Sequence, residues 1–188
     1  MNNAATINKT KTVRILGEVN VQAITELVLG LPDGLWEYET KNRNNDFKCF
    51  HSTEHIILKF HKSITDPSQF MTKPLWGIWE DKLMPLIKTA VKPYEYEKGV
   101  IPKAMFAKLL AKSKIDSHID SGERNRYCHK IHIPIQTDPD VLFYVGNQPY
   151  ELKVGYAYEV NNIVPHHVIN NSSKDRIHFI FEYFNQEY

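Results

Sequence analysis

Few cysteines, little net charge and no long apolar run mark this sequence. Its 188 residues include two cysteines, Cys49 and Cys128, which could pair but do not form a disulfide framework. The 23 basic and 22 acidic side chains leave a formal net charge of +1, which gives no support for a nucleic-acid partner. No apolar stretch approaches the roughly 20 residues of a membrane span, so we expect no membrane partner.

Residues 1–18 are polar and lack the apolar segment of a secretory signal. We therefore expect a soluble, cytoplasmic protein. The length favours a single domain that buries a core without disulfides or structural metals. No internal repeat or low-complexity tract interrupts the chain.

The first half of the chain predicts a mixture of helices and strands. Asn20 is a good N-cap for a helix with apolar residues at helical spacing. Pro74 suits the first turn of a second helix, and Pro85 inside its apolar pattern predicts a kink or two shorter helices. Three further segments indicate strands: Val13–Gly17, Leu35–Tyr38 and His55–Phe60.

From Met105 onward, short apolar runs alternate with turn residues. Regular punctuation of this kind favours an antiparallel sandwich or barrel. We expect one domain over residues 1–188, with a helix-and-strand part at about 1–104 packed on a β part at about 105–188. The predicted strands are Met105–Leu110, Tyr127–Ile135, Val141–Val145, Tyr150–Leu152, Tyr156–Val160, His166–Ile169 and Arg176–Phe184.

The sequence His118-Ile119-Asp120 suggests a metal centre. Residues two apart on an extended segment point the same way, so both side chains can reach one ion. With one distant histidine they would hold Fe(II) on one face and leave positions open for oxygen chemistry. The third ligand is either His166 or His167. Only one of them can point at the metal, because neighbouring strand residues face opposite sides. On its own, a His-x-Asp sequence is more often a surface pair.

Arg176 stands ten residues after His166 and opens the last predicted strand. Its guanidinium can grip a carboxylate by two parallel hydrogen bonds. A positive charge inside a barrel is costly unless it is paired, and a bound dicarboxylate would be such a partner. The combination indicates iron, a dicarboxylate co-substrate and dioxygen.

The block from about Met105 to Phe184 resembles the aspartyl/asparaginyl β-hydroxylase family of Fe(II)/2-oxoglutarate-dependent oxygenases. It carries IDSHID, HKIHIPIQTDPDVLFYVG, ELKVGYAYEVNN and HHVINNSSKDRIHFIF in the family's order. The resemblance implies a mainly β protein with N-terminal helices, built on a double-stranded β-helix (jelly roll). It also implies a dioxygenase that uses Fe(II), 2-oxoglutarate and O2, and that releases succinate and CO2.

The resemblance further implies roles for individual residues. The family pattern His-x-Val-x-Asn selects His166 rather than His167. The implied iron ligands, which form the catalytic centre, are His118, Asp120 and His166. The implied contacts to 2-oxoglutarate are Arg176, with its distal carboxylate, and His132.

Two positions qualify the resemblance. Lys130 stands where some family members carry an arginine with a similar role toward 2-oxoglutarate, and a lysine offers a point charge rather than a planar fork. In related halogenases a small residue at the position of Asp120 leaves room for chloride. Because Asp120 is present, hydroxylation is favoured over halogenation.

The substrate is expected to be an amino acid or a similar compound, free or as an Asp or Asn residue of a peptide. The sequence shows no module for holding a protein partner. Trp36, Asn45 and His51 are candidates for the pocket wall, while His129 and His178 are expected to be structural or peripheral. The aromatic residues near the C-terminus leave a homodimer open.

Two other functions remain possible from the sequence alone. One is a non-catalytic, cupin-like jelly roll that binds a metal or a small molecule. Cupin sites usually use His-x-His with a later Glu, so His-x-Asp followed by an arginine suits the oxygenase better. The other is a structural β-sandwich whose histidines only form hydrogen bonds in the core.

Overall fold

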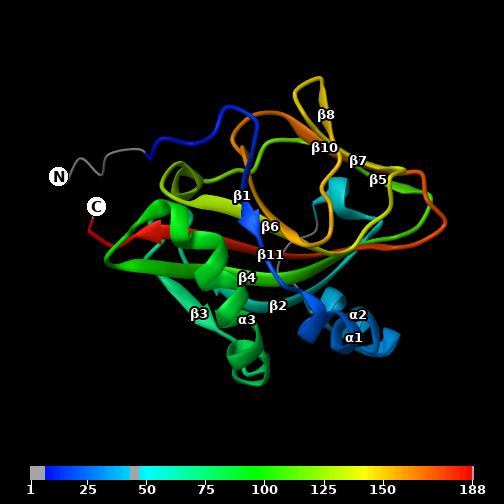
Figure 1. Ribbon diagram of the computed structural model, residues 1–188, viewed down its shortest axis with the longest axis horizontal. Helices are drawn as coiled ribbons and strands as arrows, with labels where there is room; N and C mark the ends of the chain where they lie inside the picture. Colours follow the sequence, from blue (N-terminus) through cyan, green and yellow to red (C-terminus); the bar gives the residue numbers. More distant parts are fainter. Residues whose placement is uncertain (1–6, 43–46, 188) are drawn as a thin grey trace.

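Two antiparallel β-sheets dominate the structure, a computed structural model that describes residues 7–42 and 47–187 (Figure 1). The larger sheet has the strand order β1 (Val13–Glu18), β9 (Tyr156–Val160), β6 (His129–Gln136), β11 (Arg176–Asn185), β4 (Gly99–Leu109), β2 (Thr53–His61) and β3 (Phe70–Thr72). The smaller sheet has the order β5 (Ser113–His118), β10 (His166–Asn170), β7 (Val141–Val145) and β8 (Gln148–Tyr150).

The strands from β4 to β11 form a double-stranded β-helix. Strands β4, β6, β9 and β11 lie in the larger sheet, and β5, β7, β8 and β10 lie in the smaller one. The chain therefore crosses repeatedly between two sheets whose neighbouring strands are all antiparallel. The predicted jelly roll is confirmed, and the earlier strands β1, β2 and β3 extend its larger sheet.

Three helices cover the outer face of the larger sheet, away from the smaller one (Figure 1). In α3 the ring of Trp79 packs on Phe106 of β4, with 4.8 Å between their centroids. No helix in the described part of the chain is long and apolar enough to cross a membrane. The helices are α1 (Gln22–Leu29), α2 (Asp33–Lys41) and α3 (Leu75–Val91), with short 3-10 helices at Lys48–Phe50, Lys92–Tyr94 and Glu123–Arg126.

Strand alternation divides the side chains of the larger sheet between two environments. On β11, Phe179 and Phe181 point to the helices and are fully buried in the main apolar core. Arg176, His178 and Glu182 point the other way, into the space between the two sheets. A polar inner face on an otherwise apolar sheet marks that space as the place for chemistry.

The predicted strand Leu35–Tyr38 is wrong, because these residues lie in helix α2. Aromatic residues favour strands, but here tertiary packing decides. Trp36 and Glu39, three residues apart, are buried on one side of the helix. The hydroxyl of Thr40 then accepts a hydrogen bond from the backbone N–H of His55 in β2, at 2.9 Å.

Of the two alternatives predicted at Pro85, the two shorter helices are wrong, since α3 is a single helix from Leu75 to Val91, and the kink stays a prediction. Pro85 lies on the exposed side of the helix. The carbonyl of Asp81, which loses its usual N–H partner there, therefore faces water. The predicted strands Val13–Gly17 and His55–Phe60 are confirmed, and the structure shows no Cys49–Cys128 disulfide.

Candidate metal centre

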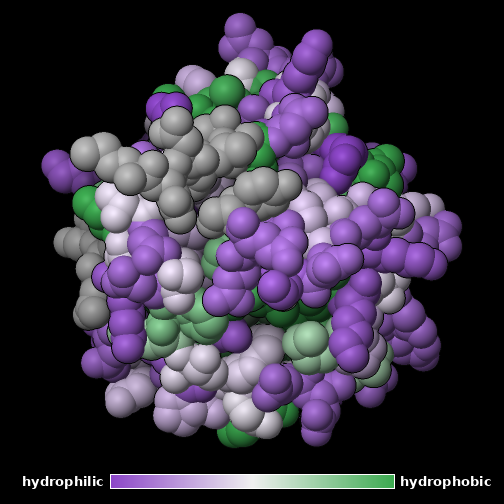
Figure 2. All heavy atoms as spheres, turned by 90° about the vertical axis from the view of Figure 1, so that its left-hand side faces the viewer, coloured by the Kyte–Doolittle hydropathy of each residue, from purple (hydrophilic) through white to green (hydrophobic). Residues whose placement is uncertain are grey.

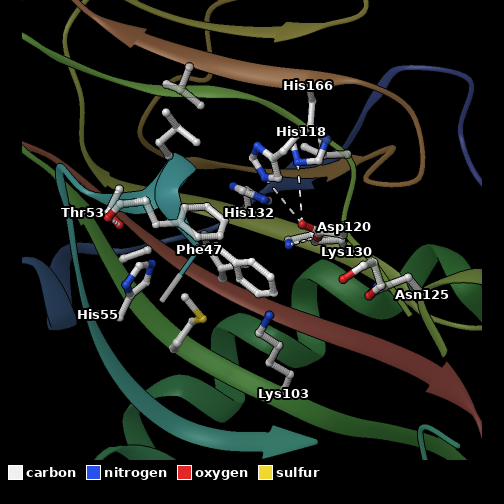
Figure 3. A pocket seen from close by; sticks show the side chains of 18 of the residues that line it. Phe47, Thr53, His55, Lys103, His118, Asp120, Asn125, Lys130, His132 and His166 are labelled. Atoms are coloured by element: carbon white, nitrogen blue, oxygen red, sulfur yellow. Dashed lines mark hydrogen bonds and ion pairs between the residues drawn. The ribbon is translucent and has the colours of Figure 1, made fainter. Parts of the chain in front are cut away.

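His118, Asp120 and His166 meet at the edge between the two sheets (Figure 3). The Oδ1 atom of Asp120 lies 3.6 Å from Nε2 of His118 and 3.9 Å from Nε2 of His166. The three potential ligand atoms all lie within 4.8 Å of one another. In the part of the chain that the structure describes, they are the one group of three or more such side chains close enough to share an ion.

The two histidines are held in the orientation that a metal requires. Nδ1 of His118 donates to the backbone carbonyl of Asp116 at 2.8 Å, and Nδ1 of His166 donates to that of Val164 at 3.0 Å. A hydrogen on Nδ1 leaves a lone pair on Nε2, and both Nε2 atoms face Asp120. Burial lowers the pKa of His166 to about 4, so its imidazole is neutral at physiological pH.

Asp120 is oriented by its other oxygen. Oδ2 accepts a short hydrogen bond from the ammonium of Lys130 and another from the side-chain amide of Asn162 at 3.0 Å. Burial alone would raise the pKa of Asp120, but Lys130 and a hydrogen bond with His118 hold it well below its usual range. The carboxylate is therefore ionised, with Oδ1 left for a metal.

The structure separates His166 from its neighbour. His166 is buried and faces Asp120, whereas the ring of His167 stacks on Tyr144 with centroids 4.3 Å apart. The expectation that His129 is structural also agrees with its contacts. It is buried, and its Nδ1 hydrogen-bonds to Glu159 at 2.6 Å.

A second group of buried polar residues lies farther between the sheets. Arg176 and His132 line the same cavity as the three candidate ligands, and both are almost fully buried. Burial lowers the pKa of Arg176 to about 9, which still leaves it charged at neutral pH. No carboxylate pairs with Arg176 among the described residues, and its Nε lacks a hydrogen-bond partner there.

The cavity between the sheets has a volume of about 420 Å³. Of the predicted wall residues, Asn45 lies outside the described residues, and the predictions for Trp36 and His51 are wrong. Trp36 is 2% exposed in the core behind the larger sheet, and His51 is exposed. The N-terminal half instead contributes Phe47, Phe50, Thr53, His55, Ile57, Phe60 and Ile64.

Two basic cavity residues were missed from the sequence. Lys103 points into the cavity from β4 (Figure 3), and Arg124 lines it from the short helix Glu123–Arg126. A strand that reads Lys103-Ala-Met-Phe-Ala carried one available signal, since a lysine two residues before Met105 must share its face. The position of Arg124 depends on the turn between Asp120 and the short helix, and the local sequence does not indicate where that turn directs the side chain.

The part of the chain that carries this site matches a known protein family. The model of the aspartyl/asparaginyl β-hydroxylase family matches residues 81–186, more than half of the chain. The chain belongs to this family. It is accordingly a hydroxylase of the Fe(II)/2-oxoglutarate-dependent oxygenase class. The matched region includes every strand of the smaller sheet and all three candidate ligands.

Solved structures share the fold at low sequence identity. HygX from Streptomyces hygroscopicus, solved with nickel and 2-oxoglutarate, has a TM-score of 0.56 at 12% identity over 93% of this chain and 83% of its own. A 2OG-Fe(II) oxygenase family oxidoreductase from Burkholderia pseudomallei has a TM-score of 0.53 at 11% identity, over 70% of this chain and 66% of its own. A viral collagen prolyl hydroxylase from Paramecium bursaria Chlorella virus-1 has a TM-score of 0.53 at 7% identity, over 93% and 96%. No curated protein sequence matches the chain.

The residues present fit the cofactor of this family. The donor set of two imidazoles and one carboxylate is the one that non-haem Fe(II) takes. The buried Nε2 of His132 and Nε of Arg176 both lack partners among the described residues. Both are nitrogen atoms on groups that can donate hydrogen bonds, and an oxygen-rich dianion such as 2-oxoglutarate would supply acceptors.

Proposed function

We propose that the protein hydroxylates a C–H bond of an amino acid or amino-acid-like substrate, free or peptidyl, with Fe(II), 2-oxoglutarate and O2. The observation that carries the proposal is one cavity with an ion site at its edge and, farther in, a buried arginine that has no carboxylate partner among the described residues. A metal site alone would need no such arginine. An arginine alone would need no such cluster of ligands.

We infer the role of each residue from its contacts. His118, Asp120 and His166 would hold the metal, which when bound supplies the activation of O2 that C–H hydroxylation requires. Arg176 would pair with the distal carboxylate of 2-oxoglutarate, and His132 would donate a hydrogen bond to the same co-substrate. Lys130 is still proposed to act in co-substrate binding, although its ammonium bonds to Asp120 here.

Asp120 favours hydroxylation over halogenation. Its Oδ1 atom already faces the Nε2 atoms of both histidines, while Oδ2 is held by Lys130 and Asn162. A carboxylate whose other oxygen is held in this way would occupy the coordination position that a halide needs. We therefore expect an alcohol as the product.

The non-catalytic jelly roll is the second candidate, and Arg176 argues against it. A metal-binding protein without a co-substrate would keep a buried, charged guanidinium for which the described residues provide no carboxylate partner. Such a charge lowers stability and has no compensating role. A bound dianion would pair with the guanidinium and give its charge a role in binding.

The test is an anaerobic titration of the metal-free protein with Fe(II) and then 2-oxoglutarate, followed by visible absorption. We expect a weak charge-transfer band that saturates at one equivalent of each. His166→Ala should abolish it, and His167→Ala, one residue away on the other face of β10, should retain it. A wild-type protein that gives no band, or equal bands in both variants, would contradict the proposed site.

A further inference from the structure

Three cationic side chains gather at the end of the cavity near Asp120. In the register of the larger sheet, Glu182 of β11 lies opposite Lys103 of β4 on one side and opposite Lys130 of β6 on the other. The side chains of Glu182, Lys103 and Lys130 all point into the space between the sheets. Arg124 joins them from the helix that follows Asp120.

Two carboxylates form ion pairs with the two lysines. The ammonium of Lys130 bonds to Asp120, and that of Lys103 lies 3.6 Å from Glu182. Glu182 is almost fully buried and also accepts a hydrogen bond from His61 at 2.5 Å. Of these three cations, Arg124 is the one for which the described residues provide no carboxylate partner.

The hydrogen bonds of Arg124 do not neutralise it. Its Nη1 donates to the backbone carbonyl of Ser63 at 3.3 Å, and its buried Nε has no partner among the described residues. Burial lowers the pKa of Lys103, and the charges of Lys130 and Arg124 add to this effect, against the opposite effect of Glu182 and Asp120. The basic groups at this end therefore repel one another, and one more anion would balance their charge.

The proposed cofactors do not supply that anion. Fe(II) and 2-oxoglutarate carry opposite double charges, so together they leave the charge of the cavity unchanged. The distal carboxylate of 2-oxoglutarate is already assigned to Arg176. The excess positive charge at Arg124 therefore remains when the proposed cofactors are bound.

Apolar side chains complete this end of the cavity. Phe60, Ile64 and Met105 line it together with the basic group. The ammonium of Lys103 lies 5.3 Å from the centre of the Phe60 ring, a cation–π distance. An acidic group with a short carbon chain matches such a surface, because the basic residues take the acid and the apolar ones take the chain.

We propose that the substrate is a small carboxylate whose acid group is held by Arg124, with Lys103 beside it, so that its carbon chain lies toward the metal. This inference rests on the proposed function. It narrows the substrate class to acids and excludes neutral amides and esters of the same size. It also gives Arg124 a binding role that differs from that of Arg176.

The test measures binding to the anaerobic complex with Fe(II) and 2-oxoglutarate, by the perturbation of its charge-transfer band and by calorimetry. The panel contains the common L-amino acids and their α-carboxamides. L-Aspartate, L-asparagine and the α-amide of aspartate distinguish an α-carboxylate from a side-chain carboxylate. We expect at least one acid to bind about tenfold or more tightly than its matched amide.

Variants assign that preference to a residue. Arg124→Gln should reduce the preference for the acid at least about tenfold, while the charge-transfer band of the complex without substrate stays intact. Arg126→Gln, an exposed arginine on the same short helix, should leave the preference unchanged. An intact band in Arg124→Gln also shows that this variant folds.

The outcomes separate the inference from the proposed function. If the wild-type protein gives no charge-transfer band, the proposed function fails. If the band forms but no acid in the panel is preferred over its amide, or if Arg124→Gln keeps the preference, the carboxylate inference is overturned.

Discussion

The hydrogen-bond partner of each Nδ1 atom determines what the buried histidines can do. In His118 and His166 this partner is a backbone carbonyl, which only accepts, so Nε2 is left as a metal ligand. In His132 the partner is Nδ1 of His178, at 3.3 Å. A second imidazole can donate, and His132 can then present an N–H instead of a lone pair at Nε2.

His178 is thus expected to position His132. If His178 donates to Nδ1 of His132, the Nε2–H of His132 is free to donate to 2-oxoglutarate. His178→Phe should raise the Kd of 2-oxoglutarate about five- to tenfold and leave Fe(II) binding unchanged. Calorimetry on the metal-loaded protein measures the Kd, and nitrogen NMR of the ring reports the tautomer. An unchanged Kd together with an unchanged tautomer would contradict this role.

Arg176→Met should have opposite effects on the free and the bound protein. The substitution removes a buried charge that has no carboxylate partner among the described residues, so the apoprotein should be as stable as wild type or about 1–3 kcal/mol more stable. The rise in Tm that 2-oxoglutarate gives the Fe(II) form should disappear. Thermal unfolding with and without 2-oxoglutarate measures both, and Lys174→Met, exposed before the same strand, is the control. A large loss of stability in the apoprotein would show that the guanidinium is compensated.

The candidate ligands were predictable because their signal is local. The spacing His118-x-Asp120 and the family pattern around His166 are short stretches of sequence. Lys103 and Arg124 were not predictable in the same way. Their position in the cavity follows from strand pairing and from a turn, both of which depend on residues far along the chain.

At the scale of elements, strands with clear turn boundaries were predicted well and segments decided by packing were not. Val141–Val145 and Tyr156–Val160 match β7 and β9, because turn residues mark their ends. The helix α2 was missed because Leu35–Tyr38 is too short a segment to distinguish the helical period from the strand period. The edge strand β3 was missed because only Phe70–Thr72 pair with β2.

Two glycines test how the elements meet. At Gly99, the first residue of β4, an added Cβ would collide with the hydroxyl and ring of Tyr183 on β11. Tyr183 is buried and stacks on Tyr96 with centroids 5.5 Å apart, so moving its ring would disrupt packing and cost free energy. Gly99→Ala should lower the free energy of unfolding by about 1–3 kcal/mol.

Gly77 supplies the matched control for that substitution. It lies in α3 with nothing within 4 Å of an added Cβ. Gly77→Ala should raise the free energy of unfolding by up to about 1 kcal/mol, because alanine favours helix. Urea unfolding of both variants measures the sign of each change in the free energy of unfolding. Equal effects would mean that the contact between Gly99 and Tyr183 does not limit the packing of β4 on β11.

At the scale of the whole molecule, the surface gives little support for a homodimer through the last strand. Phe179 and Phe181 are fully buried in the chain's own core, and Tyr188 lies outside the described residues. The face in Figure 2 is mainly hydrophilic, with apolar side chains in small areas. The oligomeric state and the single-domain organisation stay predictions.

Buried histidines between the two sheets make the stability of the whole protein sensitive to mild acid. Burial, and next to it the charge of Arg176, lower the pKa of His132 and of His178 well below the usual range. In the unfolded chain a histidine takes up a proton near pH 6.5. Below that pH the unfolded state binds protons that the folded state does not, so the free energy of unfolding falls as the pH is lowered.

The loss of stability should therefore begin before the carboxylates titrate. Asp120 and Glu182 have pKa values held below the usual range, so their contribution is lost only at lower pH. Below the unfolded-state pKa, each buried histidine should lower the free energy of unfolding by up to about 1.4 kcal/mol per pH unit. Urea unfolding of the chelator-treated protein at several pH values measures the slope. His178→Phe should make this slope shallower by about the contribution of one histidine. A slope unchanged by His178→Phe would mean that this imidazole also takes up a proton in the folded state.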